Sequence, residues 1–271
     1  MNKCEHTFLP NFVYSNVREN PYHHKLGESE FSNFVYRDHE GEYFRGLWNE
    51  EAFKRIAPIH VEVGCGYGDF LIHFCNQNPQ VNFVALDYRF KRGHQVAKKL
   101  ITAIDKSKSD KSDKSDESGH YKFLRAKGER ISYLFAENEI DNMYLFFPDP
   151  WPKLRHHKKR LFNQFFLESL YVILKPGGRL FFKTDHDGYF EWALEQVKLT
   201  QLADKFKLTF HTHDLWQKDI DIVDSEEKIF LNSFATKFEK IFISQDIKVK
   251  ALTIETLKST LKPILKPTLE S

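Results

Sequence analysis

The regular alternation of short apolar segments with amphipathic segments, which begins at residue 59, limits the fold more than any other feature of this sequence. Strands that alternate with helices form parallel sheets whose two faces are both covered. We therefore predict an α/β fold with a doubly wound, mostly parallel sheet in a single domain. The predicted strands are residues 59–63, 82–87, 121–126, 142–147, 179–185 and 206–212. The predicted helices are residues 69–78, 91–104, 160–174 and 189–198.

Three regions do not follow this alternation. Residues 1–45 are aromatic and polar without a clear period, and we interpret them as an N-terminal arm that either packs on the domain or contacts the substrate. Residues 105–120 nearly repeat Lys-Ser-Asp, and because they offer nothing apolar to bury, we predict a solvated insertion. The main domain would span residues 46–250, and residues 251–271, with two Lys-Pro steps, would form a loosely packed tail.

Composition excludes several classes of protein. Lys and Arg total 40 against 38 Asp and Glu, so a basic surface must come from local clustering and not from bulk charge. Three cysteines cannot form a disulfide framework, and neither a signal peptide nor a run of 18 apolar residues is present. We expect a cytoplasmic protein without a membrane span. His156 and His157 lack a third ligand at suitable spacing, so no metal site is predicted.

A glycine-rich turn follows the first predicted strand. Glu62 precedes three glycines spaced two residues apart, and Asp87 ends the next predicted strand. Glycine lets the backbone turn sharply and approach a ligand closely, and a carboxylate at the second position can accept hydrogen bonds from ribose hydroxyls. The pattern resembles the S-adenosylmethionine site of class I methyltransferases, whose cofactor carries a positive sulfonium. A tight turn without a ligand and a nicotinamide or flavin site remain the alternatives. The three glycines are Gly64, Gly66 and Gly68.

A proline-rich and then basic segment follows the fourth predicted strand. In a doubly wound sheet, ligands bind at the carboxyl ends of the strands, so Asp149 is predicted to lie beside the reactive end of the cofactor. The prolines on either side stiffen the loop, and Trp151 can supply a rigid aromatic wall. Five Lys or Arg residues then crowd into positions 153–160, where they could bind phosphates. Cations at the start of a helix oppose its dipole, which argues against a purely structural role for this run.

Three separate motifs together resemble the bacterial tRNA (guanine-N7-)-methyltransferase family. They are FFPDPWPKLRHHKKR at residues 146–160, FKTD at residues 182–185 and TKFE at residues 236–239. The resemblance runs from about residue 48 to residue 242. It implies a Rossmann-like class I methyltransferase fold, S-adenosylmethionine as cofactor and tRNA as partner. The implied reaction transfers a methyl group to N7 of a guanine in the variable loop of tRNA.

The resemblance also assigns site residues by position. Asp149 matches the catalytic aspartate proposed for the family. The cofactor-binding positions are Glu62, Gly64, Gly66, Gly68, Asp87, Lys127 and Asp149. The substrate-binding positions are Lys153, Asp185, Thr236, Lys237, Phe238 and Glu239. From their charge, we expect contacts with RNA phosphates from Arg155, Lys158, Lys159 and Arg160.

This sequence departs from the family pattern around the cofactor. Asp87 stands where members commonly have Glu. Lys127 aligns roughly with an acidic residue near the adenine, and Glu129, two residues on, is the alternative for that contact.

The chemistry implied by the resemblance requires positioning more than proton transfer. The N7 lone pair of guanine needs no deprotonation, so we hypothesise that Asp149 and Asp185 hold the guanine by its N1–H and exocyclic amine. The alternatives are a nucleic-acid methyltransferase acting on an exocyclic amine, which would have adjacent prolines in this loop, and a non-catalytic RNA-binding protein of the same fold. The sequence leaves open whether the protein is a monomer or a homodimer.

Overall fold

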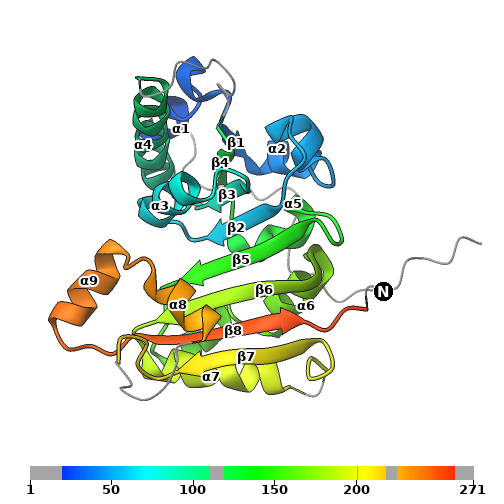
Figure 1. Cartoon of the computed structure of the whole chain (residues 1–271), viewed down its shortest axis with the longest axis vertical. Coiled ribbons are helices and arrows are strands. Elements are labelled where there is room, and N and C mark those ends of the chain that lie inside the picture. The colour runs from blue at the N-terminus through cyan, green and yellow to red at the C-terminus, as the bar shows by residue number, and fades with distance from the viewer. Residues whose placement is uncertain (1–19, 110–118, 200, 218–224, 260–271) are drawn as a thin grey trace, which may run out of the picture.

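The computed structural model describes residues 20–109, 119–199, 201–217 and 225–259. Its described strands form one sheet in the order β1-β4-β3-β2-β5-β6-β8-β7 (Figure 1). The strands from β1 to β6 are parallel, and β8 is antiparallel to both of its neighbours. This confirms the predicted mostly parallel α/β sheet. The strands are β1 (Val35–Arg37), β2 (Ile59–Val63), β3 (Asn82–Leu86), β4 (Tyr121–Arg125), β5 (Ile140–Phe146), β6 (Leu174–Thr184), β7 (Phe206–Thr212) and β8 (Lys250–Thr256).

Helices cover both faces of the sheet, and each face has its own apolar cluster. The side chains of β5 show the alternation, because Met143 and Leu145 join one cluster while Tyr144 and Phe146 join the other. The first face carries α2 (Asp38–Tyr43), η3 (Trp48–Phe53), α5 (Ile131–Leu134), α6 (Gln164–Ile173) and α7 (Asp187–Lys198). The second face carries α1 (Pro21–Lys25), η2 (Ser29–Phe31), α3 (Asp69–Gln77), α4 (Phe90–Ser109), α8 (Glu226–Asn232) and α9 (Lys237–Ser244). Two short 3₁₀ turns complete the described elements, η4 (Gly128–Arg130) and η5 (Leu154–Lys159).

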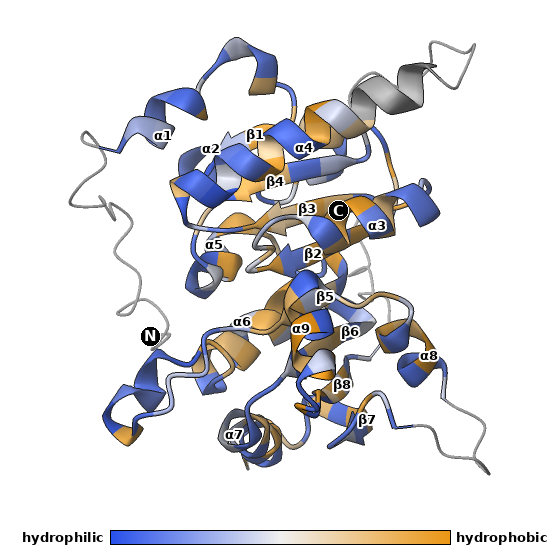
Figure 2. Cartoon of the chain, turned by 90° about the vertical axis from the view of Figure 1, so that its left-hand side faces the viewer, coloured by the Kyte–Doolittle hydropathy of each residue, from blue (hydrophilic) through white to orange (hydrophobic). Residues whose placement is uncertain are grey.

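Phenylalanine fills much of the core on the second face. The rings of Phe70, Phe74, Phe83 and Tyr144 pack at centroid distances between 5.0 and 6.0 Å. In Figure 2 the ribbons of β3 and part of α3 are orange, which marks the apolar residues of these elements. Aromatic pairs at such spacings add stabilisation beyond the area they bury. The high phenylalanine content therefore serves packing.

Two predicted boundaries are wrong. Residues 250–256 form a buried strand between β6 and β7, so the loosely packed tail cannot begin at residue 251. The run Val249–Thr256 alternates too weakly in polarity to show its place in the sheet, but β-branched Thr and Ile are a strand signal. Residues 105–109 continue α4 instead of starting the solvated insertion, and residues 110–118 lie outside the described part of the chain.

The described part of the N-terminal segment, residues 20–45, is an ordered extension. Its strand β1 adds to the edge of the sheet beside β4, with Tyr36 paired opposite Leu124. Phe31, Phe34 and Tyr36 are buried against the domain. None of these residues lines the pocket described below. Of the two interpretations of the arm, packing on the domain therefore holds for residues 20–45.

No helix in the described ranges combines the length and the apolar character needed to cross a membrane.

Candidate functional site

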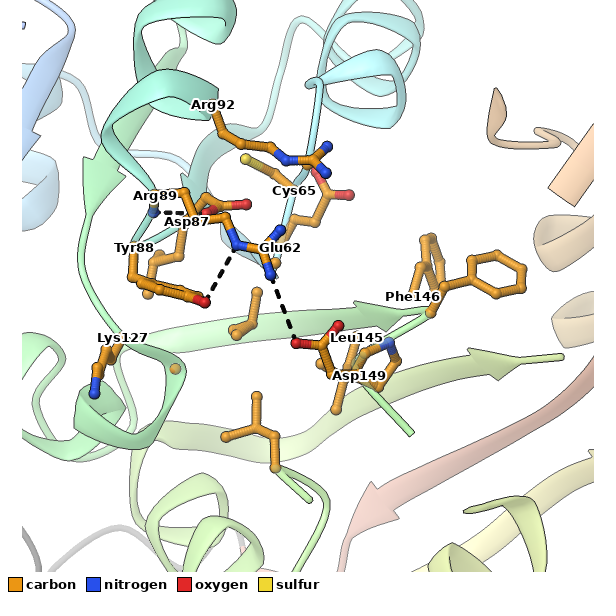
Figure 3. A pocket seen from close by; sticks show the side chains of 18 of the residues that line it. Glu62, Cys65, Asp87, Tyr88, Arg89, Arg92, Lys127, Leu145, Phe146 and Asp149 are labelled. Atoms are coloured by element: carbon orange, nitrogen blue, oxygen red, sulfur yellow. Dashed lines mark hydrogen bonds and ion pairs between the residues drawn. The ribbon is translucent and has the colours of Figure 1, made fainter. Parts of the chain in front are cut away.

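A pocket of about 1000 Å³ lies where the carboxyl ends of the parallel strands meet. The segments that follow β2, β3, β4, β5 and β6 all contribute to its lining, and α9 adds a further wall. Figure 3 shows three carboxylates among the lining side chains, those of Glu62 in β2, Asp87 after β3 and Asp149 after β5. Ligands bind at this edge in open α/β sheets, so the pocket is the candidate site.

The glycine turn after β2 has the conformation that the sequence predicts. Gly64, Gly66 and Gly68 have φ angles of 80°, 55° and 71°, in the left-handed region that other residues rarely adopt. The amides of Gly64 and Cys65 donate hydrogen bonds of 2.8 and 2.9 Å to the carbonyl of Leu86. These bonds join the turn to the end of β3, and α3 begins directly after it.

Glu62 is a buried carboxylic acid without a complete set of partners. Burial, followed by the nearby Asp69 and Asp87 carboxylates, raises the pKa of Glu62 to about 8. Its Oε2 atom is buried and accepts no hydrogen bond from any described residue. A buried polar atom that lacks a partner is costly, and a hydrogen-bond donor or cation in the pocket would satisfy it.

Asp87 lies beside Glu62 at the end of β3 (Figure 3). Burial raises the pKa of the Asp87 carboxyl, although hydrogen bonding from the Arg89 amide and the charge of Arg92 act in the opposite direction. Asp87 Oδ1 accepts a hydrogen bond of 2.8 Å from the amide of Arg89. The shorter aspartate side chain therefore reaches the pocket from this strand end.

The segment after β4 brings both Lys127 and Glu129 to the pocket lining. Between them, Gly128 packs so closely that an added Cβ would meet Val63 at 2.5 Å and Leu161 at 2.8 Å. Only glycine fits there, so this segment lies directly against the strand that carries the glycine turn. The structure thus places both candidates for the adenine-side contact in the pocket.

The proline-rich loop after β5 has a strained backbone on both sides of Asp149. Phe147 and Trp151 have φ angles of 51° and 44°, which cost about 1–3 kcal/mol each for residues with a side chain. The Asp149 carboxylate lies 3.8 Å from Arg89 Nη2 and is largely exposed to the pocket. Strain of this kind is typical of functional sites.

The predicted contact between Arg160 and RNA phosphates is wrong. Arg160 is 1% exposed, and its guanidinium donates to the carbonyls of Pro150 at 2.9 Å and Gly188 at 3.0 Å. It also lies over the rings of Tyr189 and Trp192. Arg160 therefore supports the proline-rich loop from inside the protein.

The remaining basic residues of this run divide into two groups. Lys158 and Lys159 line the pocket, and Lys159 Nζ lies 4.6 Å from the centroid of the Trp151 ring. Lys153 and Arg155 are exposed on the same segment but do not line the pocket. An array of cations at the rim of a pocket suits an extended polyanion.

Asp185, which follows β6, lines the pocket. Its backbone carbonyl accepts a hydrogen bond of 3.0 Å from Lys250 Nζ, which also forms an ion pair of 2.8 Å with Asp187. The hydrogen bond from Lys250, together with its charge, holds the pKa of Asp187 below its usual value. The strand that the sequence prediction missed, β8, thus anchors a site residue.

Three of the four residues of the TKFE motif line the pocket, namely Thr236, Lys237 and Phe238. The prediction that Glu239 binds substrate is wrong for this structure, because its side chain is completely buried and does not line the pocket. Glu239 forms an ion pair with Lys183 at 3.1 Å and accepts a hydrogen bond of 3.0 Å from Trp216 Nε1. It also completes a capping box with Thr236 at the start of α9.

Sequence reasoning missed two cations and an aromatic ring in the lining. Arg89 and Arg92 lie at the start of α4, and the Arg92 guanidinium lies 4.2 Å from the ring centroid of Tyr67 in the glycine turn. Figure 3 shows Arg89 and Arg92 beside Asp87. The sequence signal that could have identified these two arginines is their position shortly after Asp87, at the end of β3.

A family model described as "Putative methyltransferase" matches residues 56–248. A tRNA (guanine-N(7)-)-methyltransferase of Bacillus licheniformis is 36% identical over 206 residues, which cover 75% of this chain and 86% of the relative.

Two further relatives have the same name. The protein from Enterococcus faecalis is 35% identical over 174 residues, covering 64% of this chain and 75% of the relative. The protein from Bdellovibrio bacteriovorus is 29% identical over 230 residues, covering 84% of this chain and 98% of the relative.

Proposed function

This chain belongs to the tRNA (guanine-N(7)-)-methyltransferase family, and we propose that its pocket binds S-adenosylmethionine together with a guanine of the tRNA variable loop, which it methylates at N7. One observation carries this proposal. Asp149, on a strained loop, shares a pocket with Glu62 and Asp87, the two carboxylates of the glycine-turn region.

The residues present fit the cofactor. Glu62 offers a buried carboxylate oxygen that lacks a donor, which suits the cationic methionine part of S-adenosylmethionine. Asp87 offers acceptors for ribose hydroxyls, and Lys127 and Glu129 border the position for the adenine. When bound, S-adenosylmethionine supplies a methyl group on a sulfonium sulfur, so transfer to N7 breaks a C–S bond and forms a C–N bond.

The protein's contribution is to orient the guanine. The N7 lone pair is free at neutral pH, so no residue has to remove a proton before attack. Asp149 and Asp185 accept hydrogen bonds from the guanine N1–H and amine, and their charge stabilises the positive charge that develops on the ring. Both side chains line the pocket from neighbouring strands of the sheet, β5 and β6.

The RNA is held at the rim. Lys158 and Lys159 neutralise phosphates next to the target nucleotide, and Lys153 and Arg155 extend the basic surface along the same segment. Thr236, Lys237 and Phe238 contact the substrate from α9. Bases of RNA are read mainly where they are unstacked, and the aromatic ring of Phe238, 45% exposed, suits such a base.

Incubation with isotopically labelled S-adenosylmethionine and unmodified tRNA, followed by mass spectrometry of the nucleosides, tests the proposal. We expect 7-methylguanosine as the product, whereas a methyl group on an exocyclic amine would contradict the assigned reaction. Asp149→Asn should lower kcat by about 100-fold or more while S-adenosylmethionine still binds. Asp204→Asn, an exposed aspartate outside the pocket, is the matched control and should be fully active.

A further inference from the structure

We propose that Asp38, in the N-terminal extension, is a positioning residue for the cofactor pocket, although it does not line that pocket. This inference rests on the proposed binding of S-adenosylmethionine. It assigns to residues 35–43 a role in cofactor affinity, in addition to closing the edge of the sheet.

The Asp38 carboxylate joins two buried arginines, Arg125 and Arg130. Its Oδ2 lies 3.2 Å from Arg130 Nη1, and its Oδ1 lies 3.7 Å from Arg125 Nη1. The two arginine side chains are only 7% and 5% exposed. Glu42, one turn further along α2, forms a second ion pair with Arg130. The cluster therefore contains two buried positive charges balanced by two carboxylates of the N-terminal extension.

Each of the two arginines is connected to a different segment of the pocket lining. Arg125 Nε donates a hydrogen bond of 3.1 Å to the carbonyl of Tyr88, the residue directly after Asp87. Arg130 belongs to the segment that also carries Lys127 and Glu129, and it lines the pocket itself. Asp38 thus joins the segment after β3 to the segment after β4.

The elements around the two arginines are closely packed against each other. Gly41 of α2 has so little space that an added Cβ would lie 3.0 Å from both Leu124 and Leu134. Gly128, in the same short turn as Arg130, is packed still more tightly, since an added Cβ would lie 2.5 Å from Val63 of β2. Because Arg130 follows this tightly packed glycine by two residues and itself lines the pocket, a shift of Arg130 moves that wall of the pocket. Misplacement of binding groups by about 1 Å can cost up to about 100-fold in function.

Isothermal titration with S-adenosylmethionine tests the proposal on the full chain. Asp38→Asn removes the charge but keeps the shape, and we expect the Kd for S-adenosylmethionine to rise about 10- to 100-fold. Asp38→Glu should restore most of the affinity, because it can still bridge both arginines. Glu40→Gln is the matched control, since this carboxylate of the same helix bonds only to the amide of Arg37 among the described contacts. Binding of tRNA, measured separately by filter binding, should be unchanged in all three variants.

The outcomes separate this inference from the proposed function. If the wild-type chain does not bind S-adenosylmethionine, the proposed function fails. If the wild type binds and Asp38→Asn binds equally well, the inference about Asp38 is overturned. Should Asp38→Asn not fold, Glu42→Gln decides, because its carboxylate is more exposed than that of Asp38 and helps to anchor the same Arg130. A rise in its Kd of several-fold relative to Glu40→Gln supports the proposal, and an unchanged Kd contradicts it.

Discussion

Lys183 and Glu239 form a buried ion pair, 3.1 Å apart, that joins the end of β6 to the start of α9. Lys183 Nζ also donates to the carbonyls of Leu231 and Phe234, and Trp216 donates to Glu239. Burial lowers the pKa of Lys183, and the charge of Glu239 opposes that shift. Since Thr236, Lys237 and Phe238 line the pocket next to this pair, it holds that wall of the pocket in place.

Glu239→Gln should destabilise the protein by about 3–5 kcal/mol, because it leaves the Lys183 ammonium buried without a compensating charge. Among molecules that remain folded, KM for tRNA should rise while the Kd for S-adenosylmethionine changes little. Thermal unfolding and steady-state kinetics measure the two effects. The double variant Lys183→Met and Glu239→Leu should regain part of the stability but not the low KM. An unchanged KM for tRNA in Glu239→Gln would show that the position of α9 does not depend on this ion pair.

Lys158→Ala and Lys159→Ala should each weaken tRNA binding and reduce the slope of log K against log salt by about 1, because each removes one phosphate contact. Filter binding at several salt concentrations measures the slope. Glu168→Gln, on the neighbouring helix α6, changes charge outside the pocket lining and provides the control. Slopes equal to that of the wild type would place the RNA elsewhere.

Arg160→Ala should behave differently from the lysine variants although it belongs to the same basic run. It leaves the carbonyls of Pro150 and Gly188 without their donor, at about 1–3 kcal/mol each, and releases the loop that carries Asp149. We therefore expect a lower Tm and a lower kcat with an unchanged salt slope for tRNA binding. A reduced slope would restore the original assignment of Arg160 to phosphate contact.

Binding of S-adenosylmethionine should strengthen as the pH rises from about 6.5 to about 8.5. The pKa of Glu62 is about 8 in the free protein, so at neutral pH the carboxyl is mostly protonated and must lose its proton to pair with a cationic ligand. Calorimetric Kd values across this range measure the effect. Glu62→Gln should bind weakly at every pH, and a Kd for the wild type that is independent of pH would contradict the assignment.

The raised pKa of Glu62 also predicts that Glu62→Gln stabilises the free protein. Because the folded pKa of about 8 lies above that of the unfolded chain, the folded state binds more protons between pH 4.5 and 8, and the free energy of unfolding falls across that interval. Removing the acid should raise stability at pH 8 by about 1–3 kcal/mol and flatten this pH dependence. Chemical denaturation of the wild type and of Glu62→Gln at pH 5 and pH 8 tests whether the wild type loses stability as the pH rises and the variant does not.

The sequence alone was sufficient for six of the eight described strands, β2 to β7. Residues 59–63 and 206–212 form strands with the predicted bounds, because a short apolar or β-branched run between turn residues has few other stable conformations. The glycine turn and the carboxylates Glu62, Asp87, Asp149 and Asp185 were also predictable, since parallel strands bring their carboxyl ends to one edge.

Only the tertiary structure decided which similar side chains face the pocket and which face the interior. Lys159 and Arg160 are neighbours of equal charge, but Lys159 lines the pocket while Arg160 is buried against two carbonyls. Glu239 and Asp38 are likewise defined by partners far away in the chain, Lys183 in β6 and the arginines at residues 125 and 130. Local patterns report backbone propensity and periodicity, whereas burial and pairing depend on contacts between distant segments. For that physical reason, only the folded chain reveals the strand at residues 250–256 and the ion pairs that join Asp38 of the N-terminal extension to Arg125 and Arg130.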